Sequence, residues 1–426
     1  PDTRVNFMHG PNSRGTWEIL WGSLFPIFAC TWTIQHPNIP RQYGSHDGRF
    51  ATTFKRKLES LQDDMLLFVI TILAPEITIA VASCELVSAC ATRRRLKALC
   101  LREQNTSRAS AMWSLSKVRY ANMGGFVLTT ETEPSNPCRD YIFLTASELV
   151  TLWDDQHLEH LPDIADSDLE DKSKSDLLLK FIAMAEVLWV ITQISARASR
   201  GLTISPLEIS VLAYAVCAIV TYFLYWDKPK NVRTPVRVPI TPAQHQLISK
   251  VLKESRSRTM GINLYAEFLL PRDDPIRRDP GEDIHRPIGN FTALVSRDGS
   301  SLVTKAVGGV GYLALLLFAG IHLAAWNFDF PSRAELIVWR LATVYTVGFG
   351  PVALSVNLIV KHISVDLFVK KLRLMGKYSV AVRVSSSIYV LARLAIVVEA
   401  FRTLFYLPSD SYVPTWTSNI PHFLSE

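Results

Sequence analysis

Long apolar blocks separated by polar stretches dominate the pattern of the sequence. An α-helix rises 1.5 Å per residue, so a hydrocarbon core about 30 Å thick needs roughly 20 apolar residues to cross it. On this criterion we predict membrane spans at about residues 17–35, 65–91, 177–196, 206–226, 307–326, 334–360 and 382–407. The sequence therefore predicts an all-α fold, a polytopic transmembrane bundle of about seven helices.

Two sizeable polar stretches divide the chain into five segments. Residues 1–91 hold the N-terminal segment and the first two spans, 177–226 a helical hairpin, and 305–426 three spans and the tail. The polar segments are residues 92–176 and 227–304. Both are rich in Lys and Arg, and basic loops stay on the cytoplasmic side, so we expect them in the cytoplasm.

Short elements are also expected inside the polar segments. The run at residues 124–128 suggests a short strand or an interfacial segment, and amphipathic helices are expected near residues 147–160 and 242–254. The two glycines at the start of the strand run suggest a backbone turn, because glycine adopts positive φ without steric cost.

Two features of the second predicted span disagree with a simple membrane-crossing helix. Pro75 lies inside it and removes a helix hydrogen bond. The loop at residues 36–64 before it is basic, although the alternation of spans places that loop outside the cytoplasm. The span is therefore either a crossing helix or a re-entrant one, and both alternatives stay open.

Composition supports the membrane assignment and limits the partners. The chain is 48% hydrophobic and only 20% charged, whereas about a quarter of a soluble domain is charged. The net charge of +6 comes from basic residues beside the apolar blocks, which is typical of lipid-headgroup contacts. We therefore expect the lipid bilayer as a partner, and no nucleic acid.

No motif for a phosphate loop, a serine nucleophile, a zinc protease or a dinucleotide is present. Residues 154–160 contain the residue types of a metal site, but a solvated helix face is the favoured interpretation. We therefore predict no cofactor and no metal.

Acidic residues inside the apolar blocks are the main candidates for chemistry. A charge at the bilayer centre costs about 2.5–3.5 kcal/mol on insertion scales. Glu76 follows Pro75 and is the predicted proton donor, with Glu186 or Glu208 assisting. The alternative is a purely structural hydrogen bond or ion pair with a basic residue on a neighbouring helix, and for Glu76 this alternative and proton donation are equally supported. The structural alternative is favoured for Glu208, in a first helical turn, and for Arg393 with Glu399.

Aromatic side chains form the second group of candidates, because ring faces stabilise cations within about 6 Å of the centroid. The candidates for lining a substrate pocket are Trp189, Tyr214, Tyr222, Tyr225, Trp226, Trp339 and Tyr345. For any single one of them, core packing or an interfacial belt is the favoured alternative.

Five segments carry a family resemblance: GTWEILW at 15–21, CTWTIQHPNIP at 30–40, LAPE at 73–76, NMGGF at 122–126 and YWDKPKNV at 225–232. They resemble a large fungal family of multi-pass membrane proteins, most of whose members are uncharacterised. The resemblance spans nearly the whole chain. Lys117 and Glu186 depart from the pattern, in which many members have His and Gln at these positions.

The chain is also similar to the membrane-bound terpene cyclases of fungal meroterpenoid pathways. That likeness implies an enzyme in which a buried acid protonates an olefin or epoxide, after which a polyprenyl chain cyclises among aromatics. The likeness also implies a lipophilic small-molecule partner. We therefore predict a biosynthetic enzyme of fungal secondary metabolism, an isomerase or lyase of the endoplasmic reticulum or another endomembrane.

Two alternatives stay open: a proton- or cation-coupled transporter or channel, and a membrane scaffold or receptor. An enzyme should enclose a blind cavity, a transporter a path to both faces, and a scaffold no sizeable cavity.

Overall fold

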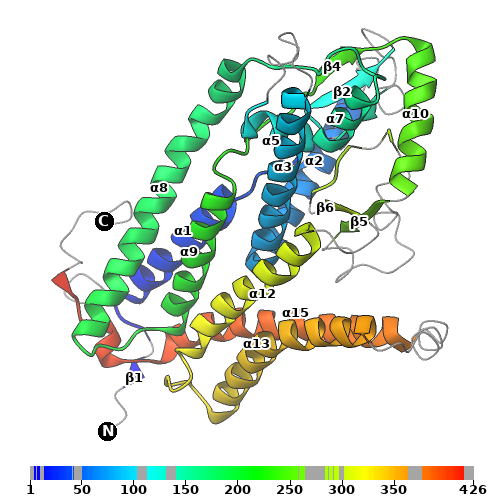
Figure 1. The fold of residues 1–426 in the computed structure, drawn as a ribbon. Coiled ribbons are helices and arrows are strands. Elements are labelled where there is room, and N and C mark those ends of the chain that lie inside the picture. Colours follow the sequence, from blue (N-terminus) through cyan, green and yellow to red (C-terminus); the bar gives the residue numbers. More distant parts are fainter. Residues whose placement is uncertain are drawn as a thin grey trace.

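The computed structural model describes residues 4–5, 7–9, 14–40, 42, 50–102, 113–130, 141–257, 259–263, 284–285, 287–290, 292–296, 302–362 and 377–416. The fold is mostly helical (Figure 1). The longer helices are α1 (Thr16–Thr33), α2 (Phe50–Leu73), α3 (Pro75–Arg102), α8 (Asp166–Ser199), α9 (Pro206–Leu224), α12 (Leu302–Leu323), α13 (Arg333–His362) and α15 (Lys377–Arg402).

Four of the described helices are long and apolar enough to cross a membrane. They are Pro75–Leu101, Leu178–Ser199, Pro206–Leu224 and Val384–Tyr406. Asp64–Leu73 and Gly309–Leu323 are shorter apolar helices. The structure thus has helices at all the predicted spans, and four of the described helices are compatible with a membrane protein by length and composition.

The second predicted span is divided at Pro75, as the proline indicates. The helix stops at Leu73, Ala74 is not helical, and α3 begins at Pro75. The break follows from proline chemistry, since the ring removes an N–H donor and clashes with the preceding turn. The same α3 continues to Arg102, and α8 starts at Asp166, so both extend beyond their apolar blocks.

Helix α9 occupies the centre of the helical region and packs against α1, α3, α8, α12 and α15. Its buried face is built of small residues, including Ala213, Ala215 and Ala218. Small side chains let helix backbones approach closely where lipid gives no hydrophobic driving force. The same device brings α3 to α12, where a Cβ added at Gly311 would lie 2.9 Å from the Ala80 Cβ.

The two polar stretches fold together at one end of the long helices, opposite α13 and α15 (Figure 1). Strand β2 (Phe126–Thr129) pairs antiparallel with β3 (Ile142–Phe143) and parallel with β4 (Val236–Pro239). The largest buried cluster covers this sheet with α5 (Leu115–Asn122), α7 (Ala146–Asp154) and α10 (Pro242–Ser257). The predicted strand and the two amphipathic helices are confirmed.

Further short elements complete the described fold. They are β5 (Thr259–Asn263) paired with β6 (Thr292–Ser296), β1 (Arg4–Val5) paired with β7 (Leu407–Pro408), and the 3-10 helices η2 (Thr403–Tyr406) and η3 (Ser409–Tyr412).

The turn before β2 depends on glycine, as the sequence suggests. Gly124 has a φ of +83°. A Cβ on Gly125 would lie 2.3 Å from the Tyr120 ring and 2.5 Å from the Tyr120 carbonyl oxygen. This region is therefore a packed turn.

Buried cations attach the sheet region to the helix ends. Lys230 Nζ donates to the Thr33 carbonyl at the end of α1 (2.6 Å), and Arg119 Nη2 to the Leu224 carbonyl at the end of α9 (2.7 Å). Lys228 Nζ binds Glu85 on α3 (2.7 Å). Burial lowers the pKa of Lys228, and the Glu85 carboxylate opposes that shift. Lys230 and Arg119 thus stabilise the carboxyl ends of α1 and α9, where positive charge is favourable.

Candidate functional site

The break at Pro75 leaves backbone carbonyls that need new donors. Ile77 N–H donates to the Ala74 carbonyl, so the Leu73 carbonyl loses its usual helical partner. Arg393 Nε from α15 donates to the Leu73 carbonyl (2.6 Å), and the Tyr214 hydroxyl from α9 donates to the Ile72 carbonyl (2.5 Å). Two neighbouring helices thus stabilise the break, which is the way such interruptions are tolerated at membrane depth.

Glu76 lies directly after this break and is buried. Its Oε1 accepts a hydrogen bond from the Tyr389 hydroxyl, and its Oε2 lies 3.4 Å from Arg393 Nη2. The Arg393 guanidinium also lies over the Phe318 ring, 3.9 Å from the ring centroid. Acid, cation and aromatic rings from α3, α12 and α15 therefore meet at one point.

A cavity of about 150 Å³ adjoins this cluster. Residues of α1, α2, α9, α12 and α15 line it, and most of them are aliphatic. Its polar side chains are Ser210, Tyr214, His322 and Arg393, and Phe318 adds an aromatic face. Glu76 does not line the cavity itself and meets it through Arg393.

Glu208 lies in a different environment, at the start of α9. Its carboxylate binds Arg14 Nη2 (2.6 Å) and accepts from the backbone N–H (2.8 Å) and hydroxyl (2.9 Å) of Ser205. The Glu208 N–H in turn donates to Ser205 Oγ (3.2 Å), and this bond together with the one from the Ser205 N–H forms a capping box, which satisfies donors at the start of the helix.

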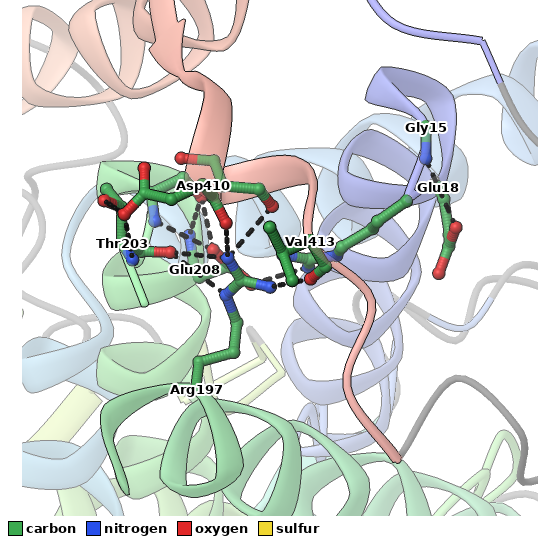
Figure 2. Close-up of polar contacts among 10 residues, drawn as sticks. Gly15, Glu18, Arg197, Thr203, Glu208, Asp410 and Val413 are labelled. Atoms are coloured by element: carbon green, nitrogen blue, oxygen red, sulfur yellow. Dashed lines mark hydrogen bonds and ion pairs between the residues drawn. The ribbon is translucent and has the colours of Figure 1, made fainter. Parts of the chain in front are cut away.

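Arg197 at the end of α8 belongs to the same region, which Figure 2 shows. Its guanidinium donates to the backbone carbonyls of Thr203, Asp410, Ser411 and Val413. Asp410 in turn accepts from the Thr203 hydroxyl (2.5 Å). We call Arg14, Arg197, Thr203, Glu208 and Asp410 the terminal clamp, because they join the N-terminal segment, the α8–α9 turn and the C-terminal segment.

Glu186, the third predicted acid, is buried on α8 and does not line the cavity. Lys117, the other departure from the resembled family, binds Asp163 (2.8 Å) and Asp166 (3.4 Å) near the start of α8. Burial lowers the pKa of Lys117, but the two carboxylates outweigh it and raise the pKa overall.

Of the predicted aromatic residues, Tyr214 lines the cavity. Trp339 is fully buried, with its ring centroid 6.0 Å from that of His322. The other five do not line the cavity. Three of them contact neighbouring residues: the Tyr222 hydroxyl binds Thr33, Tyr225 packs on His36, and Tyr345 donates to Ser385. Of the two tryptophans, Trp189 is half-buried on α8 and Trp226 is exposed.

Sequence reasoning did not assign Arg393, His322, Phe318 or Tyr389 to the site. Two of them had a usable signal, since Arg393 and His322 are ionisable residues within apolar blocks. The expected association of Arg393 with Glu399 is not found, since Arg393 pairs with Glu76 and Arg402 binds Glu335 (2.7 Å). Arg393 and Glu76 are 317 positions apart, which local patterns cannot bridge.

Within the described ranges, no group of three or more His, Cys, Asp or Glu side chains could hold a metal ion. In the string at residues 154–160, Asp154 binds Arg95 of α3 at 3.0 Å.

The sequence profile of DUF8562, a family of unknown function, matches residues 1–258. This is more than half of the chain, so the protein belongs to that family. The matched part contains Glu76 and Tyr214, whereas His322, Tyr389 and Arg393 lie beyond it. No curated protein and no solved structure matches the chain.

Proposed function

We propose that this member of DUF8562 is a seven-span membrane enzyme of a fungal endomembrane. It cyclises a lipophilic isoprenoid substrate in an acid-initiated reaction, with Glu76 as the proton donor. In this proposal α1, α2 with α3, α8, α9, α12, α13 and α15 provide the seven crossings.

The observation that carries the proposal is the partnering of Glu76 beside the cavity. A carboxylate is held in its charged form by short hydrogen bonds and nearby cations. Glu76 has one neutral donor, Tyr389, and one long contact of 3.4 Å to Arg393. Glu208, in contrast, has Arg14 at 2.6 Å and two donors from Ser205. The charge of Glu76 is therefore less compensated than that of Glu208, and Glu76 takes up a proton at a lower cost than Glu208 does. A protonated Glu76 is an acid in apolar surroundings.

The cavity size sets which part of the substrate reacts there. Its volume of about 150 Å³ equals that of a cavity known to bind benzene. A ring or a head of about six carbons fits, whereas a whole polyprenyl chain does not. The rest of the chain must therefore lie between helices or in lipid.

The chemistry balances without a cofactor. Once the Arg393 side chain, through which Glu76 meets the cavity, moves aside, Glu76 transfers its proton to an olefin. The resulting carbocation closes a ring, and the last cation returns a proton to the carboxylate. The Phe318 and Tyr214 rings, 5.2 Å apart at the cavity wall, offer faces that stabilise the cation. The net reaction is an isomerisation.

A second candidate is a proton-coupled transporter, which the helix break favours. Discontinuous helices with ionisable residues at the break are typical of transporter binding sites. In that case Glu76 would release and rebind a proton while its pairing with Arg393 alternates.

The decisive experiment compares Glu76→Gln with Glu18→Gln, an exposed acid on α1, in purified protein in nanodiscs. Polyprenyl olefins and epoxides serve as substrates, and products of unchanged mass are separated by gas chromatography. The amide keeps shape and hydrogen bonding but cannot act as an acid. Glu76→Gln should lower turnover by about 10² to 10⁴ while Glu18→Gln keeps it.

A folded and fully active Glu76→Gln protein would refute the role of Glu76, and Glu186→Gln would be the next variant to test. If no variant and no wild-type sample forms an isomer, while proteoliposomes show proton flux that Glu76→Gln abolishes, the transporter is the correct assignment.

A further inference from the structure

The polar end of the cavity presents a free donor. A guanidinium carries five N–H groups. In Arg393 the described partners engage Nε, through the Leu73 carbonyl, and Nη2, through Glu76. Nη1 has no hydrogen-bond partner in the part of the chain that the structure describes. Because Arg393 lines the cavity, Nη1 is left for a bound molecule.

His322 supplies an acceptor at the same cavity. Its Nδ1 lies 2.8 Å from the Phe318 carbonyl oxygen, and a carbonyl can only accept. Nδ1 therefore carries the ring proton, and Nε2 keeps its lone pair. A second proton on Nε2 would add a positive charge to an apolar cavity that the Arg393 guanidinium already lines.

The charge of the site favours a neutral molecule. While Glu76 is ionised and paired with Arg393, before it takes up the proton of the proposed reaction, the cluster of the two has no net charge. An anionic head group would bring a further negative charge into apolar surroundings without its own counter-charge, which is costly.

We propose that the cavity binds the neutral, hydroxyl-bearing ring of a lipophilic molecule. The hydroxyl donates to His322 Nε2 and accepts from Arg393 Nη1. The ring fills the volume of about 150 Å³ against Phe318 and Tyr214, and the aliphatic tail leaves between the helices. The inference rests on the proposed function only in naming this molecule as the substrate.

Equilibrium binding to the full chain in nanodiscs tests the proposal with four probes. They are 4-pentylphenol, 4-pentylcyclohexanol, pentylbenzene and 4-pentylbenzoate, each measured as saturable binding above that of empty nanodiscs. At least one hydroxyl probe should bind about tenfold more tightly than pentylbenzene and pentylbenzoate, as expected for two buried hydrogen bonds. The phenol and the cyclohexanol distinguish an aromatic from an alicyclic ring. Equal binding of pentylbenzene, or tightest binding of pentylbenzoate, would overturn the proposal.

A variant of His322 tests whether this residue accepts the hydrogen bond from the bound hydroxyl. His322→Phe removes the acceptor and should weaken 4-pentylphenol about three- to tenfold while sparing pentylbenzene. Leu317→Phe, on the exposed face of the same helix, is the matched control and should change neither. A folded His322→Phe protein with unchanged selectivity would contradict the proposal.

Glu76→Gln provides a second test that does not depend on the folding of His322→Phe. It leaves the Arg393 charge uncompensated, so the preference should shift about tenfold or more toward 4-pentylbenzoate. An unshifted preference would show that Glu76 does not set the charge of the site. No turnover is measured, so an enzyme assay that fails would defeat the cyclase proposal and leave these binding results standing.

Discussion

Among the residues that the structure describes, two arginine–glutamate pairs have both partners buried, and their surroundings differ. In the terminal clamp, Arg14 and Glu208 are 2.6 Å apart, and the Ser205 N–H and hydroxyl complete the carboxylate. At the helix break, Arg393 and Glu76 are 3.4 Å apart, and a cavity adjoins the arginine. Burial alone therefore does not distinguish a structural acid from a reactive one.

The difference lies in how fully each carboxylate is hydrogen-bonded and not in the arginines, because Arg14 Nε and Nη1 are buried without a hydrogen-bond partner among the described residues. A buried polar group that is fully satisfied holds a single arrangement, whereas a partly satisfied one can change its protonation or its partner. The clamp joins three chain segments through backbone carbonyls, which a substrate cannot replace. The Glu76 cluster keeps a free guanidinium nitrogen at a cavity. We therefore propose a stabilising role for the first and a chemical role for the second.

The largest expected effect is the loss of Arg197. Arg197→Ala would leave the carbonyls of Thr203, Asp410, Ser411 and Val413 without this donor. Unsatisfied buried groups cost about 1–3 kcal/mol each, so the variant should lose about 3–5 kcal/mol or fail to fold. Thermal unfolding in detergent, followed by size-exclusion chromatography, measures this.

Arg200→Ala, at an exposed position one turn further along, is the control and should unfold like the wild type. If Arg197→Ala were as stable as this control, the clamp would not be structural.

The next effect compares the two pairs directly by double-mutant cycles. Glu208→Gln with Arg14→Met should give a coupling energy of about 2–3 kcal/mol, because the contact is short and both groups are buried. Glu76→Gln with Arg393→Met should give about 1 kcal/mol, because the contact is 3.4 Å long. Unfolding free energies from denaturant titration provide both cycles. A larger coupling in the Glu76 pair would reverse our assignment of the two pairs.

The sequence predicts those features of the fold that depend on residues close together in the chain. The helices follow from apolar length, the break from Pro75, the turn before β2 from Gly124 and Gly125, and the start of α9 from Ser205 with Glu208. Each of these depends on neighbours within a few positions.

Contacts between residues far apart in the chain cannot be predicted from local sequence patterns, and the sequence-based predictions missed them. Arg393 meets Glu76, and β4 joins β2 although it comes from the second polar stretch. The ionisable residues of the site were visible as charges in apolar blocks, but their partners depend on how the helices pack. Aromatic residues are harder still, because core packing and a substrate pocket have the same composition.

The smallest expected effect distinguishes two buried tyrosines. Tyr389→Phe removes the neutral donor to Glu76 and should cost about 1 kcal/mol of unfolding free energy, a typical value for one hydrogen bond. Tyr412→Phe in the clamp region should cost less than about 0.5 kcal/mol, since its hydroxyl contacts to Leu404 and Thr16 are both 3.4 Å long. Turnover separates them further: it should change in Tyr389→Phe, whose hydroxyl touches the acid, and stay at the wild-type value in Tyr412→Phe. If the two variants had the same turnover, the tyrosine at Glu76 would be no more than a packing residue, and the contrast between the two pairs would rest on Arg393 alone.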